Sequence, residues 1–224
     1  MEKAASPSVF GLYSGRMKFV AQKINGWLRR IPSWPLYILG PVPALLYFYW
    51  GVTNQLGADP LNVLERQLGK YALQLLILTL LVTPLRQMTG ISLLKFRRAF
   101  GLMAFFYVIF HLLTWVVLDK QFYWSEILAD LTKRPYIIIG MLAFTLLIPL
   151  ALTSNRFSIR RLGPLKWGNL HKLSYIAVVL GAIHYLMLVK SWPTEPVLYV
   201  VGAIFLVLVR LNWARLLKLT ASAR

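Results

Sequence analysis

Six long apolar stretches constrain the fold of this chain more than any other feature of its sequence. They run approximately over residues 35–52, 71–88, 99–118, 135–153, 173–189 and 196–211. A helix that crosses a membrane needs about 20 mostly apolar residues, and each stretch approaches that length. We therefore expect an all-α polytopic membrane protein, folded as one bundle of six transmembrane helices. Gly40, Pro41 and Pro43 interrupt the first stretch, so we expect that helix to be kinked.

Composition supports a membrane protein and narrows its chemistry. Hydrophobic residues make up 58% of the 224 residues and charged residues only 14%, which is far from the balance of a soluble domain. The chain has no cysteine, which excludes disulfides, thiolate-ligated haem and cysteine-ligated iron–sulfur clusters. Any redox activity would therefore depend on a bound cofactor.

The positive charges indicate how the bundle is oriented. Nineteen of the 25 Lys and Arg residues precede the first stretch or lie at the connections after the second, fourth and sixth. The remaining six share the opposite side with six of the seven acidic residues. Cytoplasmic connections are the ones enriched in Lys and Arg, so both termini are expected in the cytoplasm. The net charge of +18 then reports membrane topology, and no nucleic-acid partner is expected.

Three segments divide the chain. Residues 1–34 are expected to form a basic cytoplasmic segment near the lipid headgroups, without a removable signal peptide; a disordered basic tail fits the same composition. Residues 35–211 form the six-helix transmembrane domain, and residues 212–224 a basic cytoplasmic tail. Between the third and fourth stretches, WSEILADLTKRP is expected to form a short interfacial helix.

Two of the three histidines fall inside apolar stretches, where an ionisable side chain is a candidate for function. His111 lies about twelve residues into the third helix and His184 about eleven into the fifth, and both helices run outward, so the two should lie at one depth. Two neutral imidazoles facing each other are what a six-coordinate b-type haem requires. Nearby small residues, Ala104, Ala177 and Gly181, would leave room for a porphyrin. Packed histidines, or a proton relay, are the alternatives.

His171 belongs to a second level, at the cytoplasmic entrance of the fifth helix. Thirteen positions separate it from His184, which corresponds to about 140° around a straight helix, so the two rings should not share a partner. Arg97 and Arg98 begin the third helix at the same level, where they could pair with haem propionates or a flavin phosphate. His171 could bind a second haem without a histidine partner, contact a flavin or quinol, or be an interfacial histidine without a cofactor.

Four segments resemble a known family: WGNLHKLSYIAVVLGAIHYLML, VTPLRQMTGI, RRAFGLMAFFYVIFH and KRPYIIIGMLAF. They are similar to the MsrQ (YedZ) family of haem-binding membrane subunits, and more distantly to the ferric-reductase-like transmembrane domain of NADPH oxidases. His111, His171 and His184 match the three histidines of the family. Arg97 stands where NADPH oxidases carry a further histidine, so the resemblance implies one haem b, or two.

The resemblance implies an electron-transfer subunit of an oxidoreductase system in the bacterial inner membrane, with no catalytic residue of its own. Electrons would come from a cytoplasmic flavin reductase, with FMN as a further cofactor, or from quinol of the quinone pool. They would pass to a periplasmic molybdopterin methionine sulfoxide reductase (MsrP-like) that repairs oxidised proteins. A small membrane transporter or proton channel, and a structural anchor for a partner enzyme, are the rival interpretations.

Overall fold

A computed structural model describes residues 9–189, 191 and 193–222. This part of the chain is helical and contains no strand. Five of its helices are long and apolar enough to cross a membrane, and a sixth span results if a bent pair of helices is counted as one. The expected all-α bundle of six spans is confirmed. Residues 1–8 of the predicted N-terminal segment and residues 223–224 of the predicted tail lie outside the described residues.

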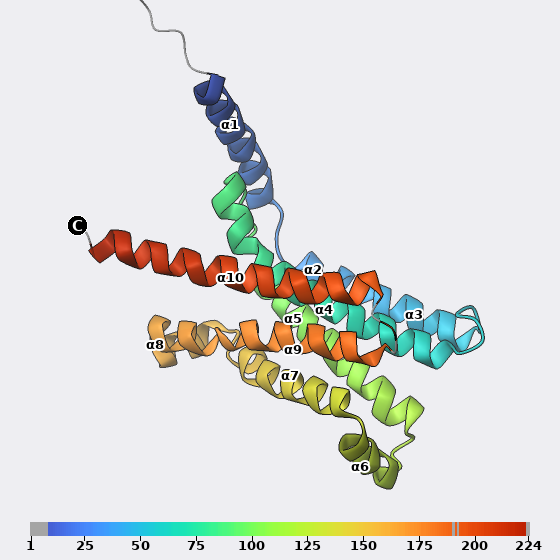
Figure 1. Ribbon diagram of the computed structural model, residues 1–224. Coiled ribbons are helices and arrows are strands. Elements are labelled where there is room, and N and C mark those ends of the chain that lie inside the picture. Colours follow the sequence, from blue (N-terminus) through green and yellow to red (C-terminus); the bar gives the residue numbers. More distant parts are fainter. Residues whose placement is uncertain (1–8, 190, 192, 223–224) are drawn as a thin grey trace, which may run out of the picture.

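The helices follow one another along the chain with short connections (Figure 1). Their bounds are α1 (Val9–Arg30), α2 (Pro35–Leu39), α3 (Val42–Val52), α4 (Pro60–Thr89), α5 (Arg97–Leu113), the π-helix η1 (Thr114–Asp119), α6 (Trp124–Lys133), α7 (Pro135–Leu152), α8 (Arg156–Leu170), α9 (Leu173–Leu188) and α10 (Thr194–Ser222). The helix at α1 contradicts the alternative of a disordered tail over those residues. The short helix expected after Trp124 is confirmed as α6.

The first span is broken into α2 and α3, as its glycine and prolines predict. Gly40 ends α2, and α3 follows immediately after Pro41. The hydroxyl of Tyr107 on α5 donates a hydrogen bond of 2.7 Å to the Gly40 carbonyl. A neighbouring helix therefore satisfies a carbonyl at the break, which is how broken helices are tolerated inside membranes.

The second span begins eleven residues earlier than the apolar stretch suggests. Asp59 caps α4 by accepting a hydrogen bond of 3.1 Å from the Asn62 backbone N–H, and Pro60 occupies the first helical position. Both are helix-start signals that outweigh the polar residues following them. Residues 60–70, which precede the apolar stretch, are therefore helical as well, and only residues 53–59 connect α3 to α4. Gly90, with φ of 77°, ends α4 in the left-handed conformation that glycine adopts without strain.

The start of the fifth span also differs from the prediction. The chain bends by 42° between α8 and α9, and His171 lies in this bend as the residue that caps α8. A single straight helix through His171 and His184 is therefore wrong, and the angle of about 140° between them, which assumed one, does not apply. The basic connection before the bend is itself helical, as α8.

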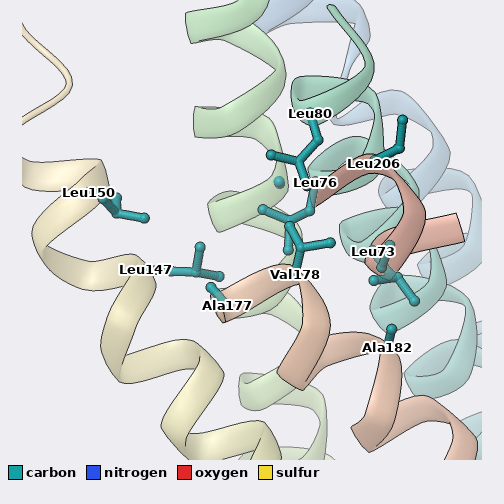
Figure 2. Packing of buried hydrophobic residues seen from close by; sticks show 11 residues of the cluster. Leu73, Leu76, Leu80, Leu147, Leu150, Ala177, Val178, Ala182 and Leu206 are labelled. Carbon is teal, nitrogen blue, oxygen red and sulfur yellow. The ribbon is translucent and has the colours of Figure 1, made fainter. Parts of the chain in front are cut away.

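The core lies where α4, α7, α9 and α10 meet (Figure 2). Side chains with almost no exposed surface include Leu80 of α4 and Ala177, Val178 and Ala182 of α9. Leu147 of α7 and Leu206 of α10 close the cluster from either side. Small residues on α9 let its neighbours approach closely, as is usual between transmembrane helices.

The two ends of the bundle differ in charge. We call the end where α4 and α10 finish and α5 and α9 begin the basic end. The opposite end, the acidic end, holds six of the seven acidic residues. All five ion pairs found among the described residues lie at this acidic end, including Lys70–Glu195 between α4 and α10.

Candidate functional site

Two histidines from different helices meet inside the bundle. The ring centroids of His111 on α5 and His184 on α9 are 6.1 Å apart, and the ring planes are inclined by 76°. The matched depth expected from the sequence is thus present in the structure. Both rings line a cavity of about 380 Å³, a volume within the usual range of small-molecule sites.

Backbone carbonyls determine which nitrogen of each ring carries the hydrogen. Nδ1 of His111 donates to the Glu65 carbonyl of α4 at 2.9 Å, and Nδ1 of His184 donates to the Tyr136 carbonyl of α7 at 2.7 Å. A carbonyl can only accept, so each Nδ1 carries the hydrogen and each neutral ring keeps its lone pair on Nε2. Metal-ligating histidines are oriented by the same kind of second hydrogen bond.

A glycine stands beside each carbonyl that holds a histidine. Gly69 follows Glu65 by four residues, and Gly140 follows Tyr136 by four. A Cβ on Gly69 would lie 3.2 Å from Nδ1 of His111, and one on Gly140 would lie 2.8 Å from Nδ1 of His184. Side chains in a helix lean toward its N-terminus, so any larger residue there would cover the carbonyl. Each glycine therefore opens one carbonyl to a histidine from another helix.

The cavity walls are apolar and include many small residues. Of the three small residues singled out from the sequence, Ala177 and Gly181 line the cavity, whereas Ala104 is buried but lies elsewhere in the core. The sequence reasoning missed the small lining residues of α4 and α7, which are Gly69, Ala72, Gly140 and Ala143. Glycines within apolar helices were the available signal, because they mark close approach of another group.

Toward the acidic end the cavity lining becomes polar. The residues there are Asn62, Glu65, Arg66, Lys70, Asp119 and Arg134. An apolar cavity with a charged mouth suits a ligand that has a flat apolar body and a charged edge. Arg97 and Arg98 do not line this cavity; they begin α5 at the basic end, where Arg98 is exposed and Arg97 half-buried.

His171 occupies a different setting at the basic end. Its ring stacks on Trp167 with centroids 3.9 Å apart, and its Nε2 lies 3.1 Å from the Thr153 hydroxyl oxygen. That hydroxyl donates to the Pro149 carbonyl at 2.6 Å, so its oxygen is left to accept from Nε2–H of His171. The lone pair of a neutral His171 therefore lies on Nδ1, the reverse of the two cavity histidines.

Among the described residues, side chains alone do not form a metal-binding site. No group of three or more His, Asp or Glu side chains there is close enough to hold an ion. The paired histidines would thus need a ligand that supplies most of the coordination itself.

Comparison with known proteins agrees with this geometry. The family model described as "Ferric reductase like transmembrane component" matches residues 68–182, a range that includes His111 and His171 and ends two residues before His184. The chain is 55% identical over 175 residues to proteins named "Protein-methionine-sulfoxide reductase heme-binding subunit MsrQ" from Brucella ovis, Brucella canis and Brucella suis. The matched region is 77% of this chain and 79% of each relative.

Proposed function

The chain belongs to the MsrQ family, the haem-binding subunits of protein-methionine-sulfoxide reductase, and we propose that it holds a b-type haem between His111 and His184. The observation that carries this proposal is the pair of rings 6.1 Å apart with both Nδ1 atoms tied to carbonyls. Neutral imidazoles with free Nε2 atoms are ready ligands and add no buried charge.

The spacing of the rings fits one metal ion between them. Metal–imidazole bonds are about 2.0–2.1 Å long and a ring nitrogen is ~1.1 Å from its centroid, so two imidazoles on opposite sides of one ion have centroids ~6.3 Å apart. The observed 6.1 Å agrees with this value. A porphyrin brings its own metal ligands, which would account for a site in which His111 and His184 are the only protein donors proposed.

The surrounding residues would position the group and exclude water. The small residues of α4, α7 and α9 leave space for a flat macrocycle, and Arg66 and Arg134 at the mouth would pair with its propionates. The haem would supply one-electron chemistry. The protein would supply the Nε2 atoms of His111 and His184, the orientation of both rings, and an apolar wall that sets the local dielectric.

We further propose the direction of electron flow. The basic end faces the cytoplasm by the distribution of Lys and Arg, and electrons enter there from a flavin reductase or from quinol. His111 and His184 would hold the haem, whose one-electron chemistry would serve a periplasmic MsrP-like molybdopterin reductase on the acidic side, in the bacterial inner membrane system. His171 contacts the donor or its flavin, since its Nε2 is already engaged by Thr153; a second haem on His171 would have to use Nδ1.

The polar residues of the spans favour this function over a transporter or proton channel. The buried Thr79 and Thr114 hydroxyls donate to carbonyls of their own helices, at 2.6 Å and 2.9 Å. Such groups are satisfied locally and do not supply a polar path of their own.

The haem content of the purified protein tests the proposal. We expect coloured protein with a reducible low-spin spectrum and about one haem per chain at the paired histidines, counted as the pyridine haemochrome. His111→Ala and His184→Ala should each abolish that spectrum, whereas His171→Ala should change it only in part. Colourless, haem-free protein from haem-replete cells would overturn the assignment.

Reconstitution tests the electron path. Haem reduced by a flavin reductase with NADPH, or by a quinol, should be reoxidised when an MsrP-like reductase and methionine sulfoxide are added. The double variant His111→Ala/His184→Ala should lose this coupled activity. Full activity in that variant would instead favour a structural anchor.

A further inference from the structure

The helix α1 is attached to the basic end of the bundle by polar contacts. The side-chain amide of Asn25 donates to the Gly90 carbonyl at 2.9 Å, and its oxygen accepts from the Ser92 backbone N–H at 2.8 Å. Nζ of Lys95 donates to two backbone carbonyls where α1 ends, at 2.9 and 2.5 Å. Gly90, Ser92 and Lys95 belong to the connection between α4 and α5. Figure 1 shows α1 projecting from the bundle at an angle to α10, so α1 is fixed at the level where these spans end.

The side chains of α1 divide into three sides at ~100° per residue. Asn25 and the buried Ala21 share the side that contacts the bundle. An apolar side lies about 110° from it in one direction, and a basic side lies about 110° from it in the other. The apolar side holds Val20, Ile24 and Trp27, and the basic side holds Lys18, Lys23, Arg29 and Arg30.

Neither the apolar side nor the basic side is covered by the rest of the described chain. Val20 is 48% exposed and Trp27 64% exposed, and all four Lys and Arg side chains of the basic side are exposed. The sequence of α1 contains no Asp or Glu, and none of the ion pairs among the described residues involves this helix. The apolar side would be stabilised by an apolar surrounding, and the basic side by anions from outside the chain.

We propose that α1 lies in the membrane surface, binds anionic phospholipid headgroups, and thereby holds the connection between α4 and α5 in place. A bilayer boundary offers acyl chains and phosphates side by side, which an amphipathic basic helix contacts together. A helix lying flat beside the spans needs its bundle contact between its apolar and basic sides, as α1 has. Pro35 begins the first broken span five residues after α1 ends, so the end of α1 lies near that boundary. A soluble acidic protein would match the basic side and leave the apolar side in water.

The contacts of Asn25 connect lipid binding to the rest of the bundle. The connection that Asn25 holds leads directly into α5, the helix that carries His111. A ligand that binds only the folded arrangement stabilises it, so headgroups bound to α1 stabilise the start of α5 through these hydrogen bonds. The proposal does not depend on the haem assignment.

Quenching by brominated lipids tests the binding of headgroups to α1. The chain has no cysteine, so Val20→Cys accepts a single fluorophore on the apolar side. In phosphatidylcholine nanodiscs, brominated phosphatidylglycerol should quench it with a binding constant at least about 5-fold higher than brominated phosphatidylcholine, the factor expected for one Lys or Arg near an anionic surface. Lys23→Gln/Arg30→Gln should remove most of this preference. The control Arg156→Gln/Arg160→Gln loses the same charge at exposed residues of α8 and should keep the preference.

Thermal unfolding tests the connection through Asn25. Phosphatidylglycerol in the nanodisc should raise the Tm of the wild type by about 2–4 °C over phosphatidylcholine alone. Asn25→Ala should keep the quenching preference and lose most of that gain, whereas Lys23→Gln/Arg30→Gln should lose both.

Four results would overturn the proposal. A fluorophore that neither lipid quenches would place α1 outside the membrane, which is the result expected if a soluble protein covers it. Equal quenching by both lipids, or an unchanged preference in Lys23→Gln/Arg30→Gln, would exclude headgroup binding by the basic side. An undiminished Tm gain in Asn25→Ala would exclude stabilisation through the connection between α4 and α5.

Discussion

At the scale of single residues, the protein positions its two cavity histidines through glycines rather than through other side chains. Each histidine reaches a carbonyl that an ordinary residue four positions later would cover. The carbonyl oxygen can accept both the helix hydrogen bond and the imidazole N–H, since it has two lone pairs. The arrangement orients a neutral ring without placing another polar side chain inside the membrane.

Gly140→Ala should therefore weaken haem binding without removing a ligand. Its Cβ would lie 2.8 Å from Nδ1 and 3.0 Å from Cε1 of His184, so the ring must move away from the Tyr136 carbonyl. Overpacking of this kind costs about 1–3 kcal/mol, equivalent to a roughly 5- to 150-fold loss of affinity. Haem retained per chain after dilution and gel filtration measures the effect.

Gly202→Ala is the matched control for that experiment, because a Cβ at this glycine of α10 would have nothing within 4 Å. It should keep the wild-type haem content. Equal haem content in Gly140→Ala and Gly202→Ala would contradict a positioning role for Gly140.

At the scale of elements, α6 is held across the acidic end by one carboxylate. Asp130 of α6 lies 3.0 Å from Lys120, which follows η1, and 3.0 Å from Arg134, which precedes α7. The carboxylate is nearly buried, with a side chain 12% exposed. It links the π-helical end of α5 to the start of α7, which presents the Tyr136 carbonyl to His184.

Asp130→Asn should destabilise this end by about 1–3 kcal/mol, because it leaves two cations without their shared anion. Thermal unfolding followed by circular dichroism should show a lower Tm. Glu126→Gln, at an exposed residue 3.8 Å from Lys120, should change stability by no more than about 0.5 kcal/mol. Equal Tm values for Asp130→Asn and Glu126→Gln would contradict this role of Asp130.

The ion pair between Asp130 and Lys120 makes the stability of the protein depend on pH. Hydrogen bonding to Asp130 raises the pKa of Lys120 above its ordinary value of 10.5. Because the folded-state pKa is the higher one, the stabilisation is complete below pH 10.5 and is lost as pH rises through the raised value. The Tm difference between wild type and Asp130→Asn should stay constant from about pH 7 to 9 and shrink above about pH 10.5. A difference that grows over that upper range would contradict the pairing.

At the scale of the whole molecule, the two ends of the bundle differ both in charge and in the functional groups they hold. The basic end holds Arg97, Arg98 and His171, and the acidic end holds the mouth of the histidine cavity. Six spans place α1 and the C-terminal end of α10 on the basic side. We expect the same positive charges to orient the chain, and they surround the proposed electron entry.

Reporter fusions should establish this orientation. A fluorescent protein that matures only in the cytoplasm should be bright after residue 224. Alkaline phosphatase, which is active only in the periplasm, should be active when inserted between η1 and α6, since Lys and Arg are enriched in cytoplasmic connections. The reverse pattern would place His171 on the periplasmic side and rule out the proposed direction of electron flow.

Hydropathy and charge, read along the chain, were sufficient for the fold class, the six spans and the matched depth of His111 and His184. They were sufficient because membrane thickness dictates helix length and a regular helix converts residue number into depth. The start of α4 at Pro60 was also readable from its capping residues, although hydropathy alone pointed to Tyr71.

Only the tertiary structure decided which groups meet. The hydrogen bonds of His111 and His184 join residues 46 and 48 positions apart, and that of Arg210 spans 127. Such contacts depend on how each helix is rotated about its axis, and these helices are apolar around most of their circumference, so no amphipathic face reveals the rotation. The packing of small residues selects the rotation of each helix. That rotation determines which carbonyls His111 and His184 reach.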